Sequence, residues 1–479
     1  MSIDHFSTAS EMVEALARKD ISATELTEIH IQRIETCDGA LNAIPVRVFD
    51  RAREVARISD QRLAAGHAGA LLGLPMTLKE STQVAGLPQT AGLELFKGYL
   101  PTVDGISATR TFEAGAVLLG KTNIPAGLSD WQADSPVYGR TLNPWDVSRT
   151  PGGSTGGGAA ALAAGMTPLE LGSDIGGSIR IPAAYCGVYG HRPSETAIPR
   201  SGAFPKADVP NASALLGVQG PLARSAKDLE LYFDVLAGPE SGEDRAWHVQ
   251  IPEPRHTLLK EFRVGVLSQL LDVTPSQSIM GKLEELTRFL EKEGCKVDQV
   301  ELPCDAEKLL QNYAKIFAMT TSQGIPEEVR QAQAKALRQS SNRLDQATAD
   351  GLTMSAQGFL REVNIRERFK FSWAKLFKDY DVIVCPTALD VAFPHAEAPW
   401  SDRILLIDNR EVPYGHNVFF SALAVYTGLP ATAFPAGLNN EGLPLGLQAI
   451  GPYLEDRTTM RFAQLLEQCW QGFTPPPDY

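Results

Sequence analysis

The sequence predicts an α/β protein, because short apolar strands alternate with helical segments along most of its 479 residues. Hydrophobic residues make up 43% of the chain and charged residues 21%, a balance typical of a globular protein with a sizeable core. No fixed-period repeat or low-complexity tract is present, which excludes solenoids and disordered tails. We therefore expect one large domain over residues 1–479, with a β-sheet core covered by α-helices.

The charge balance limits the possible partners. The chain carries 57 acidic and 44 basic side chains, a formal net charge of −13, and no basic cluster offsets this excess. A surface of this kind repels nucleic acid and anionic membranes. We expect neither nucleic-acid nor membrane binding.

Six cysteines lie far apart without a CxxC pair, so we expect reduced thiols rather than disulfides or a metal site. The first residues lack a basic segment followed by an apolar one, so no signal peptide is expected. No apolar run approaches the ~18 residues of a membrane span. These features favour a cytoplasmic protein.

The N-terminal 65 residues predict packing helices. Residues 8–11 and 22–25 both match the capping-box pattern, and each precedes apolar residues at helical spacing. Residues 51–65 continue as a charged, alanine-rich helix. We assign no chemistry to this region.

The next element, residues 73–79, is a short apolar strand that ends in Lys79. Strand interiors seldom hold lysine, because burial of an ammonium group is costly unless it is paired or loses its proton. One interpretation is an edge-strand lysine that points to solvent. The other is a desolvated lysine with a lowered pKa that acts as a base.

Turn-rich and polar-aromatic loops then surround another buried strand at 115–123. The loops at 128–132 and 143–146 run directly into a glycine-rich stretch, and loops in such positions commonly form the wall of a pocket. For a single residue such as Trp131, structural packing is at least as good an explanation.

The glycine-rich stretch holds two serines, each flanked by glycines. We call these two glycine-flanked segments the glycine beds. Ser154 lies in GGSTGGG at 152–158, and Ser178 lies in GGSIR at 176–180. Glycine permits close approach to main-chain N–H donors, so the pattern suggests a nucleophile with an oxyanion hole. A small-residue helix at 158–166 and a strand at 168–172 separate the two beds. Either serine is a candidate nucleophile at this point.

Three known glycine motifs compete for this stretch. A P-loop needs a lysine after its glycines, whereas Gly158 is followed by alanines, and the dinucleotide pattern GxGxxG matches at neither serine. Residues 152–156 do match GxSxG, the nucleophile elbow of α/β-hydrolases. That interpretation needs a downstream acid and then a histidine, for which His395 and His416 are placed.

The C-terminal half continues the alternation of strands and helices. We expect strands at 262–267, 296–302, 380–387 and 442–451, and helices at 281–293 and 457–470. Residues 416–437 contain a helix, a turn and a strand. Residues 306–378 are helical and highly charged, interrupted near 324–326, and predict a cap over the core or a solvated helical layer.

Lys79, the GGSTGGG run and DIGGSIRIPA at 174–183, in this order and spacing, resemble the amidase signature family. The resemblance covers 73–201 closely and recurs at 380–387 and 416–451. It implies a mixed, twisted sheet, a signature core at about 70–205, a variable helical section at about 306–378, and further core segments at about 380–479. Members of this family hydrolyse carboxamides with a Ser–Ser–Lys triad.

The resemblance implies a division of labour among the candidate residues. Ser178 would be the nucleophile, Ser154 a proton relay behind a cis Gly153–Ser154 peptide bond, and Lys79 a neutral base. The expected oxyanion donors are the backbone N–H groups of Ile175, Gly176, Gly177 and Ser178. The expected substrate contacts are Leu128, Asp130, Trp131 and Ser154.

The reaction that the resemblance implies is hydrolysis of a small-molecule carboxamide to a carboxylic acid and an amine or ammonia, with esterase side activity. It needs neither a metal nor an organic cofactor. The expected partner is the amide substrate itself, and a homodimer is the expected assembly.

Four positions depart from the family pattern: Glu80, Thr155, Gly158, where serine is common, and Ser173. None removes a triad member, so activity should survive. The family also includes the glutamine-hydrolysing A subunit of a tRNA-dependent amidotransferase, in which glutamine usually stands at the position of Ile181. That protein is one alternative function, and a catalytically silent binding protein is another.

Overall fold

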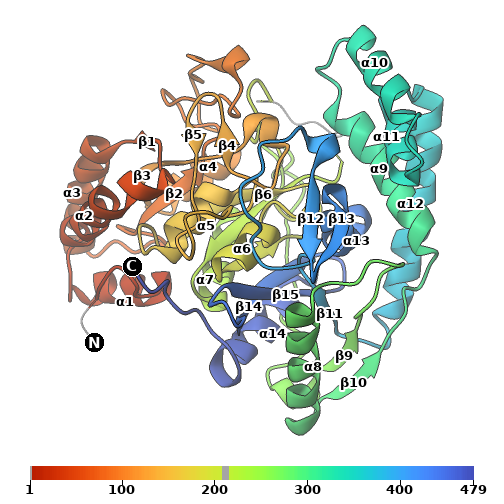
Figure 1. The fold of residues 1–479 in the computed structure, drawn as a ribbon. Helices are drawn as coiled ribbons and strands as arrows, with labels where there is room; N and C mark the ends of the chain where they lie inside the picture. Colours follow the sequence, from red (N-terminus) through yellow and green to blue (C-terminus); the bar gives the residue numbers. More distant parts are fainter. Residues whose placement is uncertain (1–2, 208–214) are drawn as a thin grey trace.

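A mixed β-sheet runs through the centre of the computed structural model, which describes residues 3–207 and 215–479 (Figure 1). Within these residues eleven strands form this sheet in the order β1-β3-β2-β6-β8-β7-β14-β15-β11-β9-β10. Their bounds are β1 (Val46–Arg47), β2 (Pro75–Lys79), β3 (Val117–Thr122), β6 (Leu169–Asp174), β7 (Tyr189–Arg192), β8 (Val218–Ala223), β9 (Arg263–Val266), β10 (Lys296–Gln299), β11 (Val382–Pro386), β14 (Ala431–Leu438) and β15 (Pro444–Ile450).

Parallel and antiparallel pairs both occur in this sheet. Strand β2 is parallel to β3 and β6, and β9 is parallel to β10 and β11, whereas β6, β8, β7, β14, β15 and β11 pair in succession as antiparallel neighbours. Two short hairpins are not part of this sheet: β4 (Asp134–Ser135) pairs with β5 (Gly139–Arg140), and β12 (Ile404–Ile407) pairs with β13 (Arg410–Pro413). The predicted α/β fold with a mixed sheet is confirmed.

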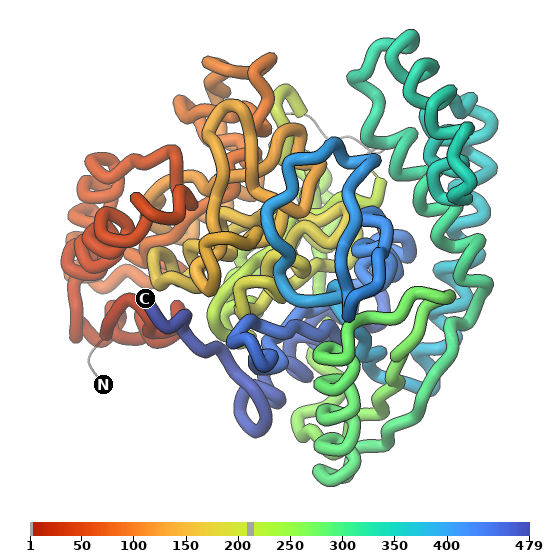
Figure 2. Tube along the Cα trace, viewed as in Figure 1, coloured from red at the N-terminus to blue at the C-terminus, as the bar shows by residue number. Residues whose placement is uncertain are grey.

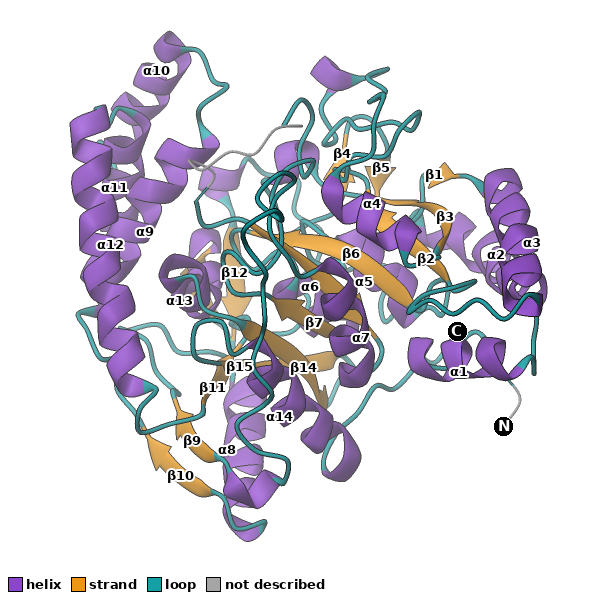
Figure 3. Cartoon of the chain, turned by 180° about the vertical axis from the view of Figure 1, so that it is seen from behind, coloured by secondary structure: helices purple, strands orange, loops and turns teal. Residues whose placement is uncertain are grey.

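The helices surround this sheet, and their order follows the predicted alternation (Figure 3). Their bounds are α1 (Ala9–Arg18), α2 (Ala23–Leu41), α3 (Phe49–Ala64), α4 (Ile106–Glu113), α5 (Gly156–Ala163), α6 (Arg180–Cys186), α7 (Ala226–Leu236), α8 (Gln277–Lys292), α9 (Ala306–Thr321), α10 (Glu327–Leu337), α11 (Arg343–Leu352), α12 (Ala356–Leu376), α13 (Phe419–Thr427) and α14 (Asp456–Cys469). Both capping boxes predicted for α1 and α2 are present. Among the described residues no helix is both long and apolar enough to span a bilayer.

Strand β2 lies inside the sheet, between β3 and β6. Lys79 at its end is 0% exposed. The interpretation of Lys79 as a solvent-facing lysine on an edge strand is therefore wrong, because β6, which comes from far downstream in the chain, covers the other side of β2.

The helical section predicted at 306–378 forms α9 to α12, which stand together on one side of the molecule, away from α1 to α3 (Figure 2). Helix α9 packs against α11, α12 and α13, and Trp373 of α12 is fully buried. This section is thus attached to the core rather than separate from it.

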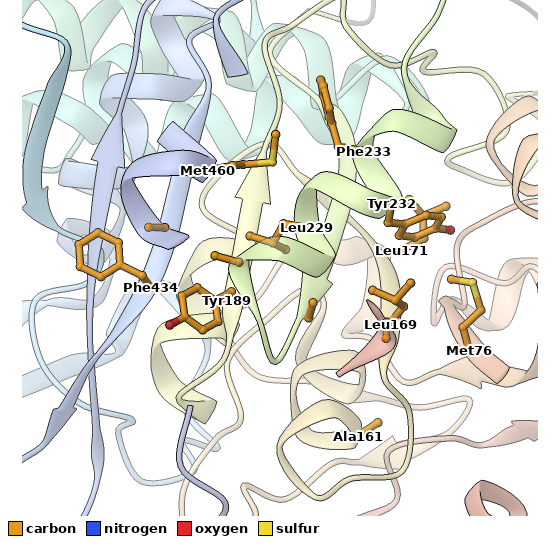
Figure 4. Packing of buried hydrophobic residues seen from close by; sticks show 14 of the residues in the cluster. Met76, Ala161, Leu169, Leu171, Tyr189, Leu229, Tyr232, Phe233, Phe434 and Met460 are labelled. Carbon is orange, nitrogen blue, oxygen red and sulfur yellow. The ribbon is translucent and has the colours of Figure 1, made fainter. Parts of the chain in front are cut away.

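The hydrophobic core continues between the sheet and α7. Leu169 and Leu171 of β6 belong to the same buried cluster as Leu229 and Tyr232 of α7 (Figure 4). Strand β6 extends beyond the predicted strand at 168–172, because Ser173 and Asp174 still pair with β8. That pairing holds the start of the Ser178 loop to the sheet.

Candidate active site

The two glycine beds meet beside the end of β2. Ser154 lies just before α5, and Ser178 lies just before α6. The backbone N–H of Thr155 donates to the carbonyl of Ser178 at 3.1 Å, which fixes the two segments side by side. Ser154 and Ser178 are 2% and 6% exposed. The fold thus brings together both serines that the sequence singled out.

The ammonium group of Lys79 reaches into this junction. Its Nζ donates to the hydroxyl oxygens of Ser154 at 2.7 Å, Thr155 at 3.0 Å and Ser173 at 2.9 Å. All three partners are hydroxyls, so no carboxylate neutralises the ammonium directly. Burial lowers the pKa of Lys79 to about 7, although the more distant Glu170 and Asp174 act in the opposite direction. Lys79 therefore changes protonation near neutral pH.

Two glycines of the motif are required by close packing. A Cβ atom on Gly153 would lie 2.3 Å from the carbonyl oxygen of Asp130. Gly177 has a φ of +86°, and a Cβ there would lie 2.9 Å from the Ser421 hydroxyl. The Gly153–Ser154 peptide bond is cis, as the family resemblance implies.

The loop that carries Ser178 is held by the carboxylate of Asp174. Asp174 accepts the backbone N–H of Gly177 at 3.0 Å and that of Ile179 at 3.2 Å, and its Oδ2 receives Nε of Arg180 at 3.0 Å. Burial opposes ionisation of Asp174, but Arg180 and Arg192 outweigh it, so its pKa lies below the usual value. Asp174 is a buried anion at neutral pH.

The bond between the Gly177 N–H and Asp174 distinguishes Gly177 from the other three predicted oxyanion donors. The Gly177 N–H already has an acceptor in Asp174. For the N–H groups of Ile175, Gly176 and Ser178, no acceptor is found in the described part of the chain. Backbone N–H donors without an acceptor, next to a serine nucleophile, are what an oxyanion hole requires.

Side chains from distant segments form the wall opposite the loop. Trp131 Nε1 donates to the carbonyl of Gly176 at 3.0 Å, and the hydroxyl of Tyr313 on α9 donates to the carbonyl of Ile175 at 3.2 Å. A Cβ on Gly176 would meet Tyr313 Oη at 3.5 Å and Val418 at 3.9 Å. Tyr313 and Val418 belong to no motif, so the sequence offered no signal for them.

The predicted substrate contacts before the motif have different environments. Leu128 is half-buried and has a φ of +59°. The carboxylate of Asp130 is already engaged, because Arg403 and the hydroxyl of Tyr414 each donate to it at 2.6 Å. Trp131 is the member of this group that the structure brings to the Ser178 loop.

A cavity of about 500 Å³ lies along the same helix as Tyr313. Its lining combines apolar and polar side chains: Leu271, Asp272, Glu307, Leu310, Gln311, Asn342, Arg343, Leu344, His416 and Phe419. Leu310 lies one helical turn before Tyr313, and Phe419 follows Val418 directly. The cavity is thus lined by chain neighbours of Tyr313 and Val418, but not by these two residues themselves.

The nucleophile-elbow interpretation gains no support from the geometry. The hydroxyl of Ser154 is bonded to lysine, and among the described residues neither His395 nor His416 forms a hydrogen bond with either serine. Within the same residues, no group of three or more His, Cys, Asp or Glu side chains is placed to hold a metal ion.

Comparison with known proteins agrees with this geometry. The chain is 30% identical to the A subunit of the glutamyl-tRNA(Gln) amidotransferase of Synechococcus elongatus, over 98% of each chain. It superposes on a bacterial aryl acylamidase of the amidase signature enzymes with a TM-score of 0.80, 26% identity and coverage of 98% of this chain and 97% of that one. A protein complex that bears on the origin of an s-triazine catabolic enzyme gives a TM-score of 0.82, with 26% identity and coverage of 98% and 99%.

The family model Amidase matches residues 25–460, which is most of the chain. The protein therefore belongs to the amidase family, the amidase signature enzymes, and is an enzyme that acts on amide carbon–nitrogen bonds.

Proposed function

We propose that the protein hydrolyses a small-molecule carboxamide to an acid and an amine or ammonia through an acyl-enzyme on Ser178. One observation carries the proposal: Lys79 is fully buried and donates to the Ser154 hydroxyl beside Ser178 without a carboxylate partner. A lysine in this environment has a pKa of about 7 and is therefore available as a neutral base.

The proposed reaction begins with proton transfer from Ser178 through Ser154 to Lys79 as Ser178 Oγ attacks the amide carbonyl. The N–H groups of Ile175, Gly176 and Ser178 stabilise the resulting oxyanion. Ser154 then protonates the departing amine, and water releases the acid along the same relay. In the described residues the Ser178 hydroxyl has no hydrogen-bond partner, so the proposed relay requires that it bond to Ser154 once substrate is bound.

The surroundings of the oxyanion loop support a neutral acyl group. Trp131, Tyr313 and Val418, which border Gly176, carry no charge. Asp130 and Arg403 neutralise each other and are not free to bind a charged substrate. The resemblance to an aryl acylamidase is consistent with an aromatic or apolar acyl or amine group.

The second candidate is the A subunit of a glutamyl-tRNA(Gln) amidotransferase. The curated relatives, at about 30% identity over nearly the whole chain, support this function more directly than the first. Ile181 in place of the usual glutamine argues against it. A homodimer and a cytoplasmic location stay predictions from the sequence.

A panel of amides distinguishes these functions. The purified protein alone should release acid from aryl, aliphatic and primary amides, with Ser178→Ala as the blank and glutamine included in the panel. Hydrolysis of glutamine alone, or activity only after addition of partner subunits, would favour the amidotransferase. No hydrolysis in any arm would favour the silent binding protein.

Asp174→Asn is expected to slow phosphonylation of Ser178 by a fluorophosphonate by about 10²-fold, because the Gly177 and Ile179 N–H groups lose the anion that holds the loop. The variant should also lose about 3 kcal/mol of stability, since Arg180 stays buried without its counter-ion. Mass spectrometry gives the rate, and urea unfolding gives the stability.

The matched control is Asp228→Asn. Asp228 is another fully buried carboxylate, which accepts the N–H groups of Ala9 and Ser10 far from the site. This control should lose stability and keep its labelling rate. If the folded Asp174→Asn protein is labelled at Ser178 at the wild-type rate, the bonds from Asp174 to the Ser178 loop play no part in the chemistry.

A further inference from the structure

A second ionisable group is buried close to the triad. Glu170 of β6 is 0% exposed, and its two carboxylate oxygens accept the hydroxyls of Thr77 and Thr122, each at 2.6 Å. Thr77 pairs with Glu170 across β2 and β6, and Lys79 pairs with Thr122 across β2 and β3. Side chains two residues apart on a strand share a face. Glu170, Thr77, Thr122 and Lys79 therefore lie on one face of the sheet.

The space that Glu170 occupies depends on Gly158. A Cβ atom on Gly158 would lie 2.5 Å from Glu170 Cγ and 2.7 Å from Glu170 Oε1. Any side chain at this position would collide with the Glu170 carboxyl group. Gly158 thus leaves room for an acid beneath the Ser154 loop, on the same sheet face as the base lysine.

The electrostatic surroundings of Glu170 point to Lys79. Burial raises the pKa of Glu170 above its usual range, while its bonds to Thr122 and Thr77 and the charge of Lys79 act in the opposite direction. Tyr232 of α7, whose pKa is raised by burial and by Glu170, stays neutral. Asp174 is the other carboxylate that acts on Lys79.

A second acid–lysine pair lies on the opposite face of the same strands. Lys121 pairs with Leu78 rather than with Lys79, and the charge that acts on it is that of Glu80. Glu80 accepts the N–H groups of Thr90 and Ala91. This pair is separate from Lys79 and provides a comparison for it.

We propose that Glu170 is a positioning residue for the proton of the base: it sets the pH range in which Lys79 is neutral and able to accept the Ser178 proton. The inference rests on the proposed role of Lys79. Two arrangements contain the same number of protons, neutral Lys79 with a carboxylic acid, and charged Lys79 with a carboxylate. In the second arrangement Lys79 already carries its proton and cannot accept that of Ser178, so ionised Glu170 opposes catalysis at neutral pH. The pH above which activity appears therefore depends on both groups.

The test follows the labelling rate of Ser178 by a fluorophosphonate from pH 5 to pH 9. In the wild type the rate should fall as the pH drops through the region near 7, where Lys79 gains its proton. Glu170→Gln removes the carboxylate that favours charged Lys79, so Lys79 stays neutral to lower pH. The acid limb of the pH–rate profile should move down by up to about one pH unit, the effect of one buried charge on a neighbouring buried group.

Two further variants make this result specific. Thr122→Val removes a hydrogen bond that favours ionised Glu170, so it should shift the limb in the same direction by less, and it keeps the carboxyl if Glu170→Gln does not fold. Glu80→Gln, on the opposite face, should leave the limb in place. Thermal melts confirm that each variant is folded.

The outcomes separate this inference from the proposed function. Labelling at Ser178 that depends on Lys79, with the same acid limb in wild type, Glu170→Gln and Thr122→Val, would overturn the role of Glu170 alone. Labelling that does not depend on Lys79 would overturn the proposed function as well. An equal shift in Glu80→Gln would show a general charge effect and also overturn the inference.

Discussion

Ser178→Ala is expected to abolish amide hydrolysis, with a loss in kcat of about 10⁴-fold to 10⁶-fold, while the protein stays folded. The substitution removes Oγ, the atom proposed to form the acyl-enzyme. It keeps the main-chain bond from Thr155 N–H to the Ser178 carbonyl, which joins the two glycine beds. The measurement is acid release from the best amide of the panel, with circular dichroism and a thermal melt to show that the fold persists.

The control compares the two serines by mass spectrometry. A fluorophosphonate should add one label to the wild type, located at Ser178, and none to Ser178→Ala. Turnover near the wild-type rate by Ser178→Ala would end the proposal. Labelling at Ser154 would instead support the nucleophile elbow at 152–156, although Ser154 is bonded to Lys79 and not to a histidine.

The sequence predicted the centre of the site because each part of it is encoded locally. A lysine at the end of an apolar strand and serines between glycines are visible within a few residues, and the close approach of Gly153 to the Asp130 carbonyl shows why glycine is needed there. The mixed sheet, in contrast, followed only from the family resemblance. Strand pairing such as that of β2 with β6 joins segments that no local pattern connects.

The wall of the site was beyond prediction for the same reason. Tyr313 reaches the Ile175 carbonyl from 138 residues away, and the carboxylate of Asp130 receives Arg403 from a distance of 273 residues along the chain. The family resemblance implies a substrate contact at Asp130. Only the folded chain shows that Arg403 and Tyr414 already occupy it.

Lys79→Ala gives the sharpest test of how the base works, because it should affect two substrates differently. An amide needs a proton on its departing nitrogen, whereas an activated ester has a good leaving group and needs only activation of Ser178. We expect a loss of about 10⁴-fold in kcat/KM for the amide and about 10²-fold for the ester.

Lys121→Ala is the matched control, because Lys121 is also fully buried in the sheet and its pKa is also lowered by burial, to about 8. Its Nζ donates to the Pro88 carbonyl rather than to a serine.

If the loss in Lys79→Ala comes only from a cavity in the sheet, both variants should lose amide and ester activity in equal proportion. If Lys79 supplies the proton through Ser154, only Lys79→Ala should separate the two substrates, and its ester activity should lose the acid limb near pH 7, because the group that titrates there is gone. Equal losses on both substrates would show that the leaving-group proton has another source.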